Sequence, residues 1–143
     1  MQKRVTMVPT REDIDELVAY LPRLYAEGFQ PILRWDGGEK TKEGYITMPW
    51  PVYDPLVEQF FTFKSCWLDY NYSPEIAGKM LQDAERVKSA TLDEIKSMLT
   101  FCVRGERFSS GHWGAMISHG HIRRLLERLV EIRSEMGQAT NQK

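Results

Sequence analysis

The run HIRRLLERLVEIRSEM, residues 121–136, decides how this chain must fold. Its apolar residues recur at alternating steps of three and four, and the charged residues fall between them. This spacing predicts a long amphipathic helix whose apolar stripe has to be buried. Either the rest of the chain or the same helix of a second copy can cover the stripe, so a homodimer through this helix is one prediction. The stripe consists of Ile122, Leu125, Leu129, Ile132 and Met136, widened by Leu126 and Val130.

Other helices are predicted upstream from their start signals. Thr91 and Glu94 form a capping box. Asp54 and Ser73 each precede a proline, which is the usual order of an N-cap and a first helical residue. Pro22 lies inside an otherwise helical pattern and predicts either a kink or two short helices. The helical segments are expected over residues 10–28, 55–68, 74–89 and 91–103.

One β-hairpin is expected near residues 29–50. FQPILRW (29–35) and YITMPW (45–50) have strand-like composition, and the glycine-rich, charged segment DGGEKTKEG (36–44) suits the loop between them. The predicted fold class is therefore α+β and predominantly helical, with about five to six helices and this single hairpin.

Length and composition predict one globular unit. A chain of 143 residues with 42% hydrophobic residues can bury a core of its own. We expect an N-terminal arm over 1–9, a single globular domain over 10–136 and a polar, frayed tail over 137–143. The sequence contains no run of about 20 apolar residues, so we expect no membrane partner and a cytoplasmic location. Cys66 and Cys102 are expected to be free thiols.

The charge distribution is uneven although the net charge is only −1. Residues 1–100 carry twelve Lys and Arg against sixteen Asp and Glu, whereas residues 101–143 carry seven against four. Such asymmetry is typical of a face that binds an anionic group, and it also arises when two halves of one fold cross.

Residues 104–124, RGERFSSGHWGAMISHGHIRR, contain four arginines and all three histidines. Gly105 is expected to cap the preceding helix, and Ser109 or Ser110 to begin a short helix that ends at Gly120. The resulting helix, tight turn and helix suggest a helix-turn-helix nucleic-acid binder as one alternative. Glutamates alternate with the arginines of the last helix and would repel phosphates, so nucleic acid is an unfavoured partner.

Several side chains of this stretch are candidates for chemistry. His112 and Glu106 are the candidate acid–base pair, and Arg104 and Arg107 could hold a carboxylate or phosphate. Their structural alternatives are hydrogen bonds of His112 and Trp113 to backbone carbonyls, and an internal salt-bridge network for the two arginines. The histidines do not have metal-ligand spacing, so no metal and no cofactor are predicted.

Aromatic residues near prolines supply two further candidates. Trp50 and Tyr53 lie in PWPVYDP (49–55), which we expect to be an irregular connector that lines an open surface. With Arg104, Arg107, His112 and Trp113 they complete the predicted ligand-binding set.

The run FCVRGERFSSGHWGAMISHGHIRRLLERL, residues 101–129, resembles the C-terminal signature of a family of small uncharacterised bacterial proteins, a domain of unknown function. YLPRLYAEGFQP and FFTFKSCWLDYNY are also similar to that family, so the resemblance extends over most of residues 17–130. It implies a single bacterial domain and brings no activity, cofactor or catalytic residue.

From the residues we predict a non-enzymatic binding or regulatory module. Its partner, a protein or a small anionic ligand, would meet the surface around residues 104–113. The alternatives are a small enzyme that uses His112 and Glu106 on an anionic substrate, and the helix-turn-helix binder described above.

Overall fold

The computed structural model describes the backbone of residues 8–141 and the side chains of residues 8–136. Most of the arm expected over 1–9 lies outside the described residues. The expected tail begins inside a helix, because α8 extends over His121–Asn141. The last two residues, 142 and 143, also lie outside the described part.

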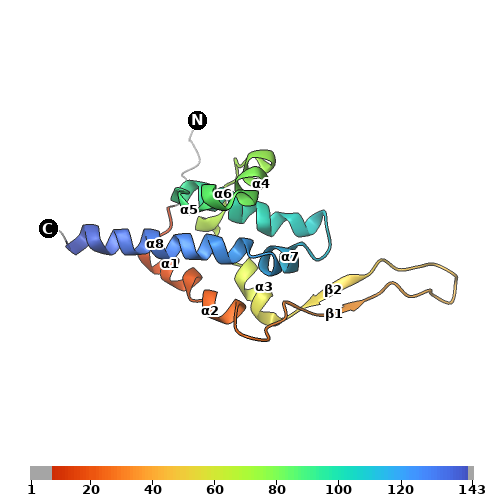
Figure 1. The fold of residues 1–143 in the computed structure, drawn as a ribbon. Helices are drawn as coiled ribbons and strands as arrows, with labels where there is room; N and C mark the ends of the chain where they lie inside the picture. The colour runs from red at the N-terminus through yellow and green to blue at the C-terminus, as the bar shows by residue number, and fades with distance from the viewer. Residues whose placement is uncertain (1–7, 142–143) are drawn as a thin grey trace.

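Helix α8 is the element around which the other helices are arranged (Figure 1). Helices α1 (Arg11–Val18) and α2 (Leu21–Leu24) pack along one side of it. Helices α5 (Ala84–Lys88), α6 (Leu92–Arg104) and α7 (His112–Ser118) also pack on it. The first part of the stripe predicted from the sequence is therefore covered within the chain, and Ile122, Leu125, Leu126 and Leu129 are all 0% exposed. Val130 is exposed, and Ile132 and Met136 are half-buried.

The N-terminal pattern divides into two helices at the place where Pro22 predicted a break. Thr10 and Asp13 form a capping box at the start of α1. Pro22 lies in the first turn of α2, where its missing N–H costs no helical hydrogen bond. The Tyr25 hydroxyl then donates to the Ile117 carbonyl at 2.8 Å and accepts from the Arg123 N–H at 2.9 Å. These bonds fasten the N-terminal segment to the turn between α7 and α8.

The helix expected over residues 55–68 ends earlier than predicted. It forms α3 (Pro55–Phe61), followed by the 3₁₀ turn η1 (Ser65–Trp67). The segment is apolar on nearly every side, and one straight helix would expose part of that surface. Because the chain turns after α3, Phe60, Phe61 and Trp67 are all buried in one core.

The segment expected as one helix over residues 74–89 is also divided. Helix α4 (Pro74–Gln82) ends at Asp83, and α5 begins directly after it. The Asp83 side chain accepts a hydrogen bond from the Arg86 N–H and so acts as the N-cap of α5. The capping box of Thr91 and Glu94 begins α6 as predicted.

The hairpin (residues 32–53) projects from the helices (Figure 1). Its strands are β1 (Ile32–Asp36) and β2 (Trp50–Tyr53), which are antiparallel with Trp35 opposite Pro51. The second strand therefore lies later than the predicted 45–50, in the segment expected to be an irregular connector. Tyr53 is buried there, whereas the earlier segment forms only an isolated bridge between Lys40 and Ile46. The predominantly helical α+β class with one hairpin is confirmed.

We predict that Leu125→Ala lowers the free energy of unfolding by about 2–5 kcal/mol, because it leaves a cavity under the centre of α8. Urea denaturation followed by circular dichroism measures this change. Val130→Ala, on the same helix at a side chain that is 43% exposed, is the matched control and should change stability by less than about 1 kcal/mol. Equal losses in the two variants would contradict the central position of the stripe.

Candidate functional site

Glu106 is a cap for helix α7. It lies in the 3₁₀ turn η2 (Gly105–Arg107), which directly follows α6. One carboxylate oxygen, Oε2, accepts from the Gly111 N–H at 2.9 Å, and the other, Oε1, accepts from the Trp113 N–H at 2.9 Å. A carboxylate at this end of a helix satisfies otherwise unpaired N–H groups and is stabilised by the helix dipole.

The start of α7 therefore differs from the prediction that Ser109 or Ser110 would cap it. The N-cap position is Gly111, with a positive φ of 89° that favours glycine. Glycine has no side chain to accept the first helical N–H groups, and Glu106 reaches them from five residues upstream. The cap comes from the neighbouring turn, which a search for local capping residues does not detect.

Tyr53 belongs to this cap rather than to an open surface. Its side chain is 7% exposed, and its hydroxyl donates to Glu106 Oε1 at 2.7 Å. Burial, together with that carboxylate, raises the pKa of the Tyr53 hydroxyl well above its usual range. The prediction that Tyr53 lines a ligand surface is not supported by this geometry, because β2 directs the residue into the core.

His112 is half-buried and forms no hydrogen bond with the carboxylate of Glu106, which accepts from other groups. Its ring lies against Gly105, where any Cβ would collide with it, and edge-on to Phe101 at 5.7 Å between ring centroids. Burial lowers the pKa of the imidazole, and it has a hydrogen bond to the backbone of Phe101. Its Nε2 atom is buried without a hydrogen-bond partner among the described residues. Gly105 is thus required for the close approach of this ring.

A surface groove of about 480 Å³ brings together four of the predicted residues, namely Arg104, Glu106, Arg107 and Trp113. His112 and Trp50 are not among its lining residues. We call it the arginine groove. Its remaining wall is aromatic and aliphatic and comes from α3, the segment after it and α6: Phe61, Phe63, Leu68, Tyr70 and Val103.

The two arginines of the groove have no ion pair with any described residue. The Arg104 guanidinium lies over the rings of Tyr72 and Tyr70, at 5.2 and 5.9 Å from their centroids. Arg107 is exposed at the rim. The internal salt-bridge network considered from the sequence is absent from the described contacts, because Glu106 is directed toward the helix end instead.

Trp113 forms part of the groove wall and is held in place on two sides. Its ring stacks on Phe61 with centroids 4.9 Å apart and planes within 7°. Its indole N–H donates to the Val103 carbonyl at 3.0 Å, as the structural interpretation of the sequence expected. The wall is therefore formed before any ligand arrives.

Sequence reasoning did not assign Tyr70, Phe61 or Phe63 to the site. Tyr70 lies in the aromatic stretch CWLDYNYSP (66–74), and aromatic residues of a small domain usually belong to its core. Only the turn after α3 places these rings beside the end of α6. The exposure of Tyr70, at 49%, distinguishes it from a core residue.

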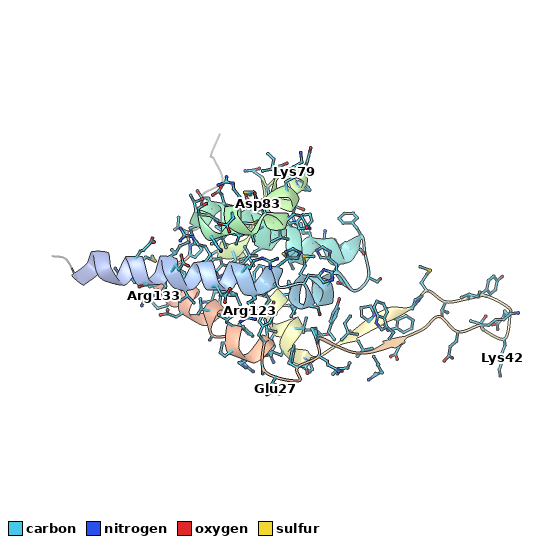
Figure 2. All side chains as sticks on the ribbon, viewed as in Figure 1. Glu27, Lys42, Lys79, Asp83, Arg123 and Arg133 are labelled. Atoms are coloured by element: carbon cyan, nitrogen blue, oxygen red, sulfur yellow. The ribbon has the colours of Figure 1, made fainter. Side chains whose placement is uncertain are left out.

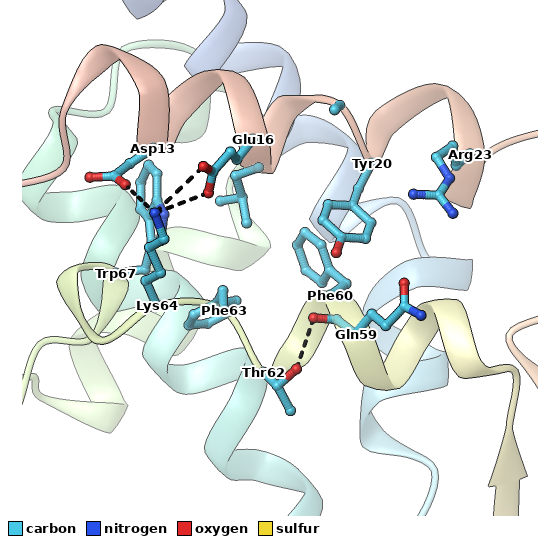
Figure 3. A pocket seen from close by; sticks show the side chains of 12 residues that line it. Asp13, Glu16, Tyr20, Arg23, Gln59, Phe60, Thr62, Phe63, Lys64 and Trp67 are labelled. Atoms are coloured by element: carbon cyan, nitrogen blue, oxygen red, sulfur yellow. Dashed lines mark hydrogen bonds and ion pairs between the residues drawn. The ribbon is translucent and has the colours of Figure 1, made fainter.

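A second cavity, of about 460 Å³, lies between α1–α2 and the segment α3–η1 (Figure 3). Three of its charged groups are paired with one another, because Lys64 Nζ lies 3.2 Å from Asp13 Oδ1 and 3.2 Å from Glu16 Oε2. Arg23 lies at the other end, over the ring of Tyr20. This pairing leaves less charge for a ligand than the arginine groove offers.

The arginines of α8 are engaged inside the chain and do not form a recognition surface. Arg128 donates to the Ala90 carbonyl at 2.9 Å, and Arg133 pairs with Asp15 at 2.9 Å. Arg124 contacts the ring of His121 at 2.9 Å, and Arg123 pairs with Glu127 at 3.5 Å. The helix-turn-helix arrangement of α7 and α8 is present, but it lacks the free basic side chains that would bind phosphates.

The described residues contain neither a metal-binding cluster nor a helix that could span a membrane. No cluster of three or more His, Cys, Asp or Glu side chains is placed to hold a metal ion. None of the described helices combines the length and apolar character that crossing a membrane requires.

Comparisons with known proteins identify one family. A model described as a family of unknown function (DUF6508) matches residues 9–135. No curated protein and no solved structure matches the chain.

We predict that Glu106→Ala lowers the free energy of unfolding by about 1–3 kcal/mol, because two helix N–H groups and the Tyr53 hydroxyl lose their acceptor. Urea denaturation of Glu106→Ala, Tyr53→Phe and the double variant measures the coupling. The losses of unfolding free energy in the two single variants should not add up to the loss in the double variant, because both variants remove the same hydrogen bond. Additive losses would mean that the hydroxyl and the carboxylate act independently.

We predict that stability falls as the pH drops below about 6.5, the ordinary pKa of a histidine side chain. Burial lowers the pKa of His112 in the folded state, so the unfolded chain binds the proton more readily. The contribution of His112 to the free energy of unfolding is therefore complete at higher pH and is lost on acidification. His112→Gln should give a flatter dependence of unfolding free energy on pH, whereas the exposed His119→Gln is the matched control. An unchanged slope in His112→Gln would contradict the assignment.

Proposed function

This chain belongs to a family of unknown function, DUF6508, and we propose that it is a non-enzymatic binding module whose arginine groove takes a ligand with an anionic group and an aromatic or apolar body. The observation that carries the proposal is the pair of guanidinium groups, Arg104 and Arg107, which face the groove without a carboxylate partner among the described residues.

The arginines suit an anion for a physical reason. Guanidinium groups form charge-assisted, forked hydrogen bonds with carboxylates and phosphates. The rings of Tyr70 and Tyr72 hold Arg104 in place without neutralising its charge. Glu106, the carboxylate among the groove residues, accepts from the N–H groups of α7 and from Tyr53 and forms no ion pair with either arginine. The positive charge of the two arginines therefore stays available to a ligand.

The aromatic wall of the groove is the reason for proposing that the ligand has an aromatic or apolar body. Trp113 stacks on the buried Phe61 and is fixed by its bond to Val103, so its ring forms a rigid apolar surface. Rigid aromatic walls with a few polar groups are typical of ligand sites. A small aromatic or apolar anion fits this combination, and so does a protein segment in which an acidic residue neighbours an aromatic one. The cytoplasmic location expected from the sequence stays part of this proposal.

The groove is less suited to acid–base chemistry. The Glu106 carboxylate already accepts three hydrogen bonds, and His112 is not among the groove residues. A general acid–base pair needs both groups within reach of the same proton. The enzymatic alternative with these two residues therefore has weaker support than the binding module.

We predict that phenyl phosphate binds in the groove and shifts the indole N–H signal of Trp113 in ¹⁵N-edited NMR spectra. A titration gives the dissociation constant, and Trp113→Phe assigns the signal. Arg104→Ala and Arg107→Ala should each weaken binding by about tenfold, the effect of losing one charge-assisted hydrogen bond. Inorganic phosphate should bind more weakly than phenyl phosphate because it does not use the aromatic wall.

Arg23→Ala is the matched control, because Arg23 is also exposed and also lies over a tyrosine ring, but it lines the other cavity. Binding that survives in Arg23→Ala and weakens in both groove variants would support the proposal. Binding that depends on Arg23, or no shift of the Trp113 signal at millimolar phenyl phosphate, would overturn it.

A further inference from the structure

The hairpin concentrates apolar side chains that the helices leave uncovered. Of the eleven large hydrophobic residues that are exposed in the described part of the chain, six lie between residues 33 and 50. The hairpin extends away from the helices with its side chains spread on both sides (Figure 2). Exposed apolar surface gathered in one segment is typical of an interaction site. The six residues are Leu33, Trp35, Tyr45, Ile46, Met48 and Trp50.

The two edges of this ribbon differ in their capacity to pair with another strand. Pro51 lies opposite Trp35, and proline has no N–H, so the direct hydrogen bonds to β2 come from the neighbouring pairs, Arg34 with Val52 and Asp36 with Trp50. Pro51 therefore occupies an outward-facing backbone position of β2, and Pro49 occupies the equivalent position before the strand. The outer edge of β2 lacks these two donors and is protected from strand addition.

The outer edge of β1 has no such protection. The same register directs the N–H and C=O groups of Trp35 away from β2. The sheet has only two strands in the described structure, and no other backbone hydrogen bond there involves Trp35. A two-stranded ribbon is marginally stable in water, and additional strands stabilise it. The edge of β1 is thus open to a further strand.

We propose that this edge pairs with β1 of a second copy of the chain, in an antiparallel arrangement with its two-fold axis at Trp35. In this register the two Trp35 residues exchange both backbone hydrogen bonds. Arg34 of each copy then lies opposite Asp36 of the other, in the non-hydrogen-bonded positions where side chains come closest. The two ribbons form one four-stranded sheet.

Charge complementarity identifies the occupant as a second copy. A two-fold axis at Arg34 would place two arginines opposite each other, and an axis at Asp36 would oppose two aspartates. Only the axis at Trp35 joins unlike charges, and Trp35 is also the residue whose backbone groups point outward. An isologous interface requires such self-complementarity. Within one copy the two side chains already attract each other, with Arg34 Nε 3.1 Å from Asp36 Oδ1.

A charge-swap experiment tests the proposal through the oligomeric state. Light scattering after size-exclusion chromatography, and sedimentation velocity over a dilution series, should show a dimer of the full chain. Arg34→Asp and Asp36→Arg should each raise the dimer dissociation constant at least tenfold, because like charges then face each other. The double variant Arg34→Asp with Asp36→Arg should restore dimerisation, because it recreates opposite charges across the axis.

Lys42→Asp is the matched control, since it reverses an exposed charge at the tip of the hairpin and outside β1 (Figure 2). It should leave the dimer intact. Circular dichroism verifies that each variant keeps its helices. A monomeric wild-type chain, a dimer that is unaffected by Arg34→Asp, or a double variant that stays monomeric would each overturn the proposal. None of these changes alters the arginine groove, so the result is independent of the proposed ligand.

Discussion

Covering the apolar stripe of α8 is the constraint on which the rest of the structure depends. The stripe is continuous from Ile122 to Leu129, and those side chains are completely buried. Helices α1 and α2 cover one side, and α5, α6 and α7 contribute to the remainder. The break at Asp83 lets α4 pack on α6 and α5 pack on α8. Because the stripe from Ile122 to Leu129 is covered within the chain, the homodimer we propose uses the hairpin.

Glu106 links this framework to the groove. By capping α7 and accepting from Tyr53, it joins the end of α6, the start of α7 and the base of the hairpin. A carboxylate engaged in this way does not neutralise Arg104 and Arg107. The same three hydrogen bonds therefore stabilise the fold and leave two arginines available beside an aromatic wall. The stability of the fold and the proposed anion site therefore depend on one arrangement.

The two proposed surfaces lie on different parts of the molecule and depend on different kinds of interaction. The arginine groove combines charge with a rigid aromatic wall, and it is built from side chains of packed helices and their connections. The edge of β1 offers unpaired backbone groups and exposed apolar residues on a projecting ribbon. The prolines of β2 restrict strand addition to one edge of that ribbon. A dimer formed at that edge would present two grooves.

The sequence by itself determined the elements whose signals are local. The period of α8, the capping box at Thr91 and the break at Pro22 each depend on residues a few positions apart, so they could be predicted. The sequence also indicated Arg104, Arg107 and Trp113 as site residues. The tertiary structure alone decided that Glu106 caps a helix, that Tyr53 is buried and that His112 lies outside the groove. The contact of Tyr53 with Glu106 joins residues 53 positions apart in the sequence. The Glu106 cap and the position of His112 depend on how η2 turns the chain after α6, and neither composition nor spacing encodes that turn.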